Sequence, residues 1–143
     1  GATPPTGAPG PSGSGASPPA GAEVPSARTS PIELDLVKLP HHGSARNVSA
    51  ELVDAVETPL WVNSSDGTRF RHPDAIALAR VLVHGRRAEP LLAFNVPSTY
   101  NRWWDSDSWR ALIPYRVEYG DPDEGLTVTF EAVDEEQVSR LEE

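Results

Sequence analysis

Two short stretches of this sequence carry side chains that could bind a metal ion or an anionic substrate. The first is PHHGS at residues 40–44, directly after an apolar run, and the second is RFRHP at residues 69–73. Neutral imidazole is a good ligand for zinc and related ions. A zinc site needs about three or four protein ligands, so we expect these histidines to form part of a site and not a whole one.

The elements around the two motifs are expected to bring them together. The run LDLVKL at 34–39 predicts a strand that Pro40 ends, and Ser49 is expected to cap the helix that follows. A strand over 60–62 and a helix with Pro73 in its first turn come next. Each motif therefore lies between a strand end and a helix start, where α/β sheets build their sites.

The later part of the chain predicts more strands. After a strand over 91–94, two alternating runs at 115–119 and 126–130 are joined by DPDEG, a turn composition that predicts a β-hairpin. The order of elements indicates an α/β layer structure. In the Trp-rich segment between these strands, we expect an amphipathic helix packed on the sheet; the alternative is a stacking surface for a sugar or base. Its tryptophans are Trp103, Trp104 and Trp109.

Composition divides the chain into two parts. Residues 1–30 are almost wholly Gly, Pro, Ala, Ser and Thr, and they bury too little apolar surface to offset the entropy of ordering. We expect a disordered, flexible linker over 1–30 and one small domain, or half of a larger one, over 31–143. The lack of Met favours a processed product or a fragment, and the lack of Cys excludes disulfides and thiolate ligands. No apolar run reaches the ~20 residues that span a bilayer, so we expect a soluble protein, with the cytoplasm as the favoured compartment.

Charge is distributed unevenly along the chain. The formal net charge is -9, and residues 105–143 carry twelve acidic side chains against three arginines. Long-range repulsion from this end disfavours binding of duplex DNA by this chain alone. Between residues 36 and 80 the acidic and basic side chains balance, which leaves room for a local basic rim near the motifs.

The two motifs and the elements between them resemble a known family. The runs VKLPHHGSARNVSAELVDAV and PLWVNSSDGTRFRHPDAIALARVL are similar to the C-terminal portion of metallo-β-lactamase-fold hydrolases, particularly the branch with the hydrolase domain of the competence protein ComEC and the phosphorylcholine esterases. The similarity covers residues 34–95 and weakens through the expected hairpin. It implies an α/β fold that is the C-terminal half of a four-layer αββα sandwich, with one or two zinc ions at its rim.

The resemblance also implies a missing half. In that family most zinc ligands come from an upstream His-x-His-x-Asp-His motif, a further His and a bridging Asp, and this chain has none of them before HHGS. We expect a complementary N-terminal half, as a separate or cleaved chain, to supply these ligands, and we expect this chain to be inactive without it. Half of a sandwich would also expose the apolar residues of 34–37, 60–62 and 91–94 unless a partner covers them.

The histidines receive roles from the resemblance. His42 is expected to be the zinc ligand. Neighbouring residues that leave a strand point to opposite sides, so His41 is expected to contact the substrate or orient a ligand; which of the two binds the metal stays open. For both, the alternative is a loop histidine bonded to backbone groups. His72 is the other candidate catalytic residue, with a hydrogen bond at the helix start as its alternative.

The predicted function is that of one part of a zinc-dependent hydrolase. Zinc would lower the pKa of bound water to about 7 and direct hydroxide at a phosphodiester or other ester. Arg69 and Arg71 would hold a phosphate, unless they are simply solvated, and Ser44 would close the turn or hydrogen-bond near the substrate. The alternative function is a non-catalytic binding or regulatory module that retains half of the fold.

Overall fold

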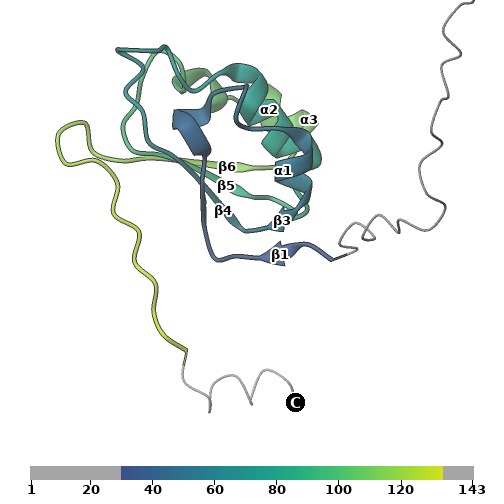
Figure 1. Ribbon diagram of the computed structural model, residues 1–143. Helices are drawn as coiled ribbons and strands as arrows, with labels where there is room; N and C mark the ends of the chain where they lie inside the picture. The colour runs from purple at the N-terminus through teal and green to yellow at the C-terminus, as the bar shows by residue number, and fades with distance from the viewer. Residues whose placement is uncertain (1–29, 134–143) are drawn as a thin grey trace, which may run out of the picture.

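The computed structural model describes residues 30–133, so the linker expected over 1–30 lies, apart from Ser30, outside the described residues. The described chain forms a four-stranded parallel sheet in the order β2-β4-β5-β6 and a separate parallel pair of β1 with β3 (Figure 1). Helices and parallel strands together place it in the α/β class, as predicted. The strands are β1 (Ile32–Glu33), β2 (Val37–Lys38), β3 (Val56–Glu57), β4 (Leu60–Asn63), β5 (Leu91–Phe94) and β6 (Arg116–Tyr119).

Three α-helices and two 3₁₀ turns connect the strands. They are η1 (Pro40–Gly43), α1 (Ala50–Asp54), α2 (Ala75–His84), η2 (Arg102–Trp104) and α3 (Asp107–Leu112). The predicted cap is confirmed, because the Ser49 hydroxyl accepts the amide of Leu52 at 3.1 Å. The prediction for Pro73 is wrong: α2 begins at Ala75 with Asp74 as its N-cap, so Pro73 precedes the helix. No helix between residues 30 and 133 has the length and apolar character needed to cross a membrane.

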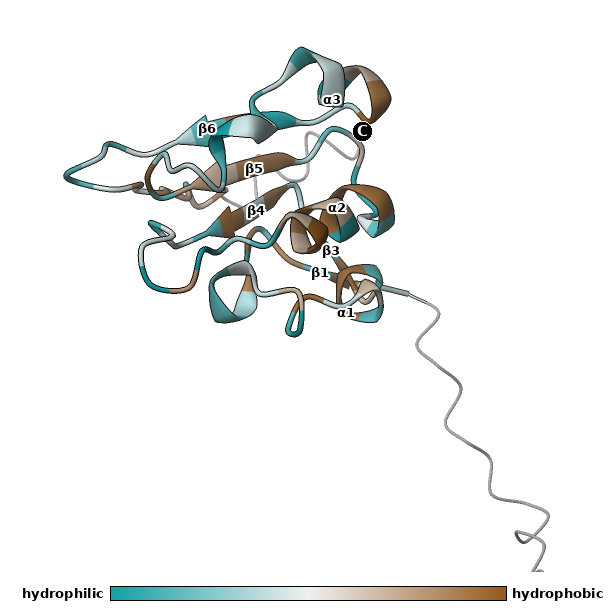
Figure 2. Cartoon of the chain, turned by 90° about the horizontal axis from the view of Figure 1, so that it is seen from above, coloured by the Kyte–Doolittle hydropathy of each residue, from teal (hydrophilic) through white to brown (hydrophobic). Residues whose placement is uncertain are grey.

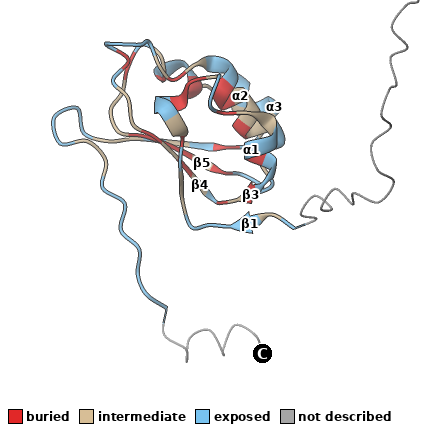
Figure 3. Ribbon diagram, viewed as in Figure 1, coloured by how far each residue is buried: buried red, intermediate tan, exposed pale blue. Residues whose placement is uncertain are grey.

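The hydrophobic core lies between the helices and one face of the sheet. The parallel register places Trp61, Leu92 and Val117 side by side on this face. These residues pack against buried residues from the helices and loops, among them Leu78 and Val81 of α2. Figure 3 shows the buried residues gathered between the strands and the helices, which all lie on the same side of the sheet. Trp61 and Leu92 are therefore buried and form no part of the exposed patch expected over 60–62 and 91–94.

Between residues 30 and 133, no helix covers the opposite face of the sheet. Leu60, Val62 and Leu91 lie on it and are half-buried, because neighbouring strands cover their flanks, and Ala93 between them is buried. Charged side chains border this apolar strip, with Lys38 on β2 and Arg116 and Glu118 on β6. The large exposed patch expected for half of a sandwich is thus reduced to a narrow, half-buried strip along the two central strands, β4 and β5, whose apolar composition Figure 2 shows.

Two sequence-based strand predictions are corrected. The strand expected over 34–39 shortens to β2 at Val37–Lys38, which pairs with β4. A separate short strand, β1, lies before the predicted run and pairs with β3. The expected β-hairpin does not form. Asp121 and Gly125 make one antiparallel bridge, but residues 126–130 contain no strand, and β6 instead pairs in parallel with β5. Alternation favours a strand only where one face is buried, and Phe130 is 58% exposed.

Candidate functional site

Both histidine motifs lie at the carboxyl edge of the sheet. The turn η1 directly follows β2, and the loop that carries His72 connects β4 to α2 (Figure 1). The ring centroid of His41 lies 6.4 Å from that of His42 and 6.1 Å from that of His72. The predicted convergence of the two loops is therefore confirmed.

The HHG turn has an unusual backbone. His41 and His42 have φ angles of 48° and 56°, and Gly43 has a φ of 79°, so three successive residues are left-handed. The expectation that the two histidines leave the strand on opposite sides rested on extended backbone, which is absent here. Histidine tolerates this region better than most side chains, whereas residue 43 must be glycine: a Cβ there would lie 2.7 Å from the Asn63 Oδ1 and 2.8 Å from the Pro73 Cβ.

Asp74 ties the two motifs together. Its amide donates to the Gly43 carbonyl at 3.0 Å, and its Oδ2 accepts the Ala45 amide at 2.8 Å. Its Oδ1 lies 3.2 Å from the His72 Nδ1. Sequence reasoning missed this residue. The available signal was an Asp directly before an expected helix, where such residues often act as an N-cap. Its bond to the Ala45 amide joins residues 29 apart in the chain, so only the folded structure shows it.

The hydrogen bonds of two histidines fix their tautomers. The His42 Nδ1 lies 2.5 Å from the Ser64 carbonyl oxygen, which can only accept, so Nδ1 carries the proton. In neutral His42 the Nε2 lone pair is then free to bind a metal. The same reasoning holds for His72, whose Nδ1 donates to the Asp74 carboxylate. In metal-binding histidines the ring nitrogen that does not bind the metal typically donates its proton to a carboxylate or carbonyl oxygen, as Nδ1 does here.

A polar pocket of about 370 Å³ opens beside His42 and His72. The serines that follow β4 form part of its wall, and Asn95, just after β5, holds this wall by accepting the Ser65 amide at 2.8 Å. Sequence reasoning did not single out Asn95. The other lining residues are Ser64, Asp66, Arg69 and Phe70.

Asn63 is a second polar residue that sequence reasoning missed. It ends β4 directly beneath the HHG turn and is 2% exposed, and neither its Oδ1 nor its Nδ2 has a hydrogen-bond partner among the described residues. A buried carboxamide normally pairs with another polar group. The signal available from the sequence was a polar residue ending an otherwise apolar strand at the edge where the site forms.

The expected substrate-binding residues are only partly brought together. The Arg69 guanidinium lies 5.0 Å from the centre of the Phe70 ring and lines the polar pocket. Arg71 does not line that pocket and lines a neighbouring hollow instead. Ser44 is buried, and its carbonyl accepts the amides of Asn47 and Val48. Both are backbone bonds, so the role expected for the Ser44 side chain stays a prediction.

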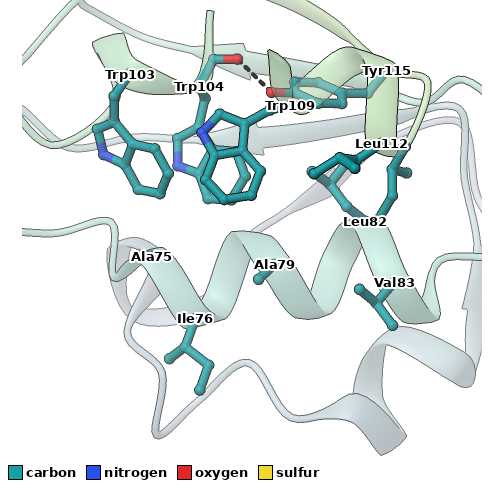
Figure 4. A pocket seen from close by; sticks show the side chains of 11 residues that line it. Ala75, Ile76, Ala79, Leu82, Val83, Trp103, Trp104, Trp109, Leu112 and Tyr115 are labelled. Atoms are coloured by element: carbon teal, nitrogen blue, oxygen red, sulfur yellow. Dashed lines mark hydrogen bonds between the residues drawn. The ribbon is translucent and has the colours of Figure 1, made fainter. Parts of the chain in front are cut away.

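A separate groove of about 410 Å³ between α2 and α3 is almost wholly apolar (Figure 4). Trp104 packs in the core as expected, whereas Trp103 and Trp109 are 39% and 44% exposed and line the groove. The one polar contact drawn in Figure 4 is internal, from the Tyr115 hydroxyl to the Trp104 carbonyl at 2.5 Å. The groove therefore offers apolar contact but no side chain placed for acid, base or metal chemistry.

His42 is a candidate metal donor, but the described residues do not form a complete metal site. Between residues 30 and 133, no group of three or more His, Cys, Asp or Glu side chains is arranged to hold one ion. His42 nevertheless has a free Nε2, which is what a single ligand of a zinc ion requires. Family models, curated proteins and solved structures give no match to this chain.

Proposed function

We propose that this chain is the C-terminal half of a metallo-β-lactamase-fold hydrolase that needs a complementary N-terminal half. The two halves share a zinc site to which His42 contributes a ligand. A bound zinc ion supplies a hydroxide nucleophile near neutral pH and stabilises the developing oxyanion. The proposed substrate is a phosphodiester or another ester.

The observation that carries this proposal is the hydrogen bond from the His42 Nδ1 to the Ser64 carbonyl. It orients the imidazole and selects the tautomer with a free Nε2, on a residue that lines a polar pocket. His72, held by Asp74, faces the same pocket and is suited to contact the substrate or a ligand of the metal. Both histidines line one pocket, and an acceptor holds the Nδ1 of each. A role limited to satisfying the Ser64 carbonyl does not explain this pairing.

The open face of the sheet supports the need for a second half. The apolar strip of Leu60, Val62 and Leu91 is half-buried within the described chain, and a second sheet packed on it would remove the remaining area from water. The charged residues that border the strip on β2 and β6 would then form the rim of that contact. In this arrangement the partner lies next to the carboxyl edge, from which it could supply the missing ligands.

The experiment is co-expression of this chain with one that carries His-x-His-x-Asp-His and the bridging Asp. The expected result is a complex that retains zinc and hydrolyses bis(p-nitrophenyl) phosphate in a zinc-dependent way. His42→Ala should leave assembly intact and lower kcat/KM by more than about 100-fold, because loss of a direct ligand exceeds the 10–100-fold loss seen for outer contacts. His84→Ala is the matched control, since His84 ends α2 outside the pocket.

Metal content decides between this function and the alternative of a binding or regulatory module. A complex that assembles but holds no zinc and shows no hydrolysis would favour the binding module. Equal activity with and without His42 would refute its assignment as a ligand.

A further inference from the structure

A second hollow, of about 660 Å³, lies beside the histidine pocket. The two share a wall that includes Asp66 and Arg69. The loop after β4 forms one side of this hollow and the loop after β5 forms the other, with Arg71 from the first and Arg102 from the second. The two hollows are therefore adjacent. We call the second one the arginine hollow.

The arginine hollow is basic although the chain as a whole is acidic. Between residues 30 and 133, four arginines use their guanidinium groups in ion pairs or hydrogen bonds to carbonyls: Arg80, Arg86, Arg87 and Arg110. Of the five other described arginines, Arg69, Arg71 and Arg102 all line this hollow. Three guanidinium groups without a carboxylate partner in one place favour an anion.

One carboxylate opposes these three arginines. Asp66 also lines the hollow, but its Oδ1 already accepts the amide of Thr68 at 2.9 Å and the Thr68 hydroxyl at 2.8 Å. Both bonds lower the pKa of Asp66. The Oδ1 of Asp66 is thus engaged by its own loop, and no ion pair joins the carboxylate to an arginine among the described residues. The local charge in the hollow remains positive.

Arg71 stands where backbone conformation favours glycine. Its φ is 57°, and its amide donates to the Gly67 carbonyl at 2.9 Å. An L-residue is strained in this left-handed region, and such strain concentrates at functional sites. Glycine would form the same turn without strain, so the backbone conformation does not explain an arginine at this position. A functional role of the Arg71 side chain does explain it.

The loops that carry the arginines are held firmly. The side chain of Asn101, which is fully buried, accepts the Ser98 amide at 2.8 Å and donates to the Val96 carbonyl at 2.9 Å. The Tyr100 ring lies so close to Gly67 that a Cβ there would meet it at 2.3 Å. The two sides of the hollow are therefore packed together before any ligand arrives, which lowers the entropy cost of binding.

We infer that the arginine hollow is a subsite for a phosphoryl group that is not the one attacked beside the histidines. The substrate class is then an ester that carries two phosphoryl groups, one in each hollow. This deepens the proposed function and rests on it for the reaction. Binding of phosphate by the arginines itself needs neither the metal nor the complementary half.

The first test is a titration of the full chain with inorganic phosphate, without zinc, followed by amide chemical shifts. We expect the shifts to concentrate at residues 66–71 and 98–102. Arg71→Gly should weaken binding about tenfold, the loss of one charge-assisted hydrogen bond, while the chain unfolds no more easily because the backbone strain is relieved. Arg116→Ala, at the start of β6 and outside the hollow, removes the same charge and should leave the affinity nearly unchanged. Equal weakening by both variants, or shifts spread over the surface, would overturn the subsite.

The second test uses the reconstituted zinc complex. Arg102→Ala should raise KM about tenfold for an ester with a second phosphoryl group and leave kcat/KM for bis(p-nitrophenyl) phosphate unchanged. Equal effects on both substrates would refute the assignment. Phosphate binding by the isolated chain with an inactive complex would reject the proposed function but keep the subsite, so the two failures are distinguishable.

Discussion

The substitution Gly43→Ala tests whether the HHG turn is locked against the loops beneath it. Two separate costs are expected. A φ of 79° is left-handed, which costs an L-residue roughly 1–2 kcal/mol. The new methyl group would also lie 2.7 Å from the Asn63 Oδ1 and 2.8 Å from the Pro73 Cβ, and overpacking of this kind costs about 1–3 kcal/mol. The free energy of unfolding should therefore fall by about 2–5 kcal/mol.

Gly125→Ala separates these two costs. Gly125 has the same φ of 79°, but a Cβ there would meet nothing closer than the Asn95 carbonyl at 3.9 Å, an ordinary contact. Its substitution should cost only the conformational part, about 1–2 kcal/mol. Both variants are compared with the natural chain by urea unfolding, with the slope of the transition checked for two-state behaviour.

The difference between the two variants measures how tightly the HHG turn is packed. The reasoning would be refuted if Gly43→Ala cost no more than Gly125→Ala, because the turn would then be free to move away from Asn63 and Pro73. A second readout is the chemical shift of the His42 imidazole, measured without phosphate, since a displaced turn would also break the hydrogen bond from His42 to Ser64. Loss of stability with an unchanged His42 environment would show that the turn stays in place and that its neighbours move instead.

Two further results are expected from the structure. Asp74→Ala removes the acceptor for the Ala45 amide and the partner of His72, and it should lower the free energy of unfolding by about 1–3 kcal/mol. The control is Asp54→Ala, which breaks a surface ion pair with Arg86 and should lower it by at most about 1 kcal/mol. Equal losses for the two variants in urea unfolding would contradict the bridging role of Asp74. Burial raises the pKa of Tyr119 to about 12: the folded state favours the protonated phenol, so its contribution to stability is complete below the ordinary pKa of about 10 and is lost as pH rises toward 12. Ultraviolet titration of tyrosinate, with Tyr119→Phe to assign the transition, measures this pKa, and a midpoint near 10 would show that the ring is not shielded.

Several elements could be predicted from the sequence because short-range physics determines them. The hydroxyl of Ser49 can cap only the helix that follows it, and apolar runs at 60–63 and 91–94 form the central strands of a sheet that is covered on one face. The placement of both histidine motifs at strand ends followed from the same pattern, since parallel strands end at one edge. The convergence of the two loops was therefore implicit in the order of elements.

Tertiary contacts decided the rest. The tautomer of His42 depends on the backbone carbonyl of Ser64, 22 residues away. Because every residue has a carbonyl, no pattern of side chains in the sequence predicts this bond. The run at 126–130 alternates like a strand, but pairing and burial, which are properties of the whole fold, determine whether a ladder continues. Arg102 joins Arg71 because two loops pack against each other across Gly67 and Tyr100. The sequence by itself determined which chemical groups stand at the edge of the sheet, and only the packing of the loops decided which of them face one another.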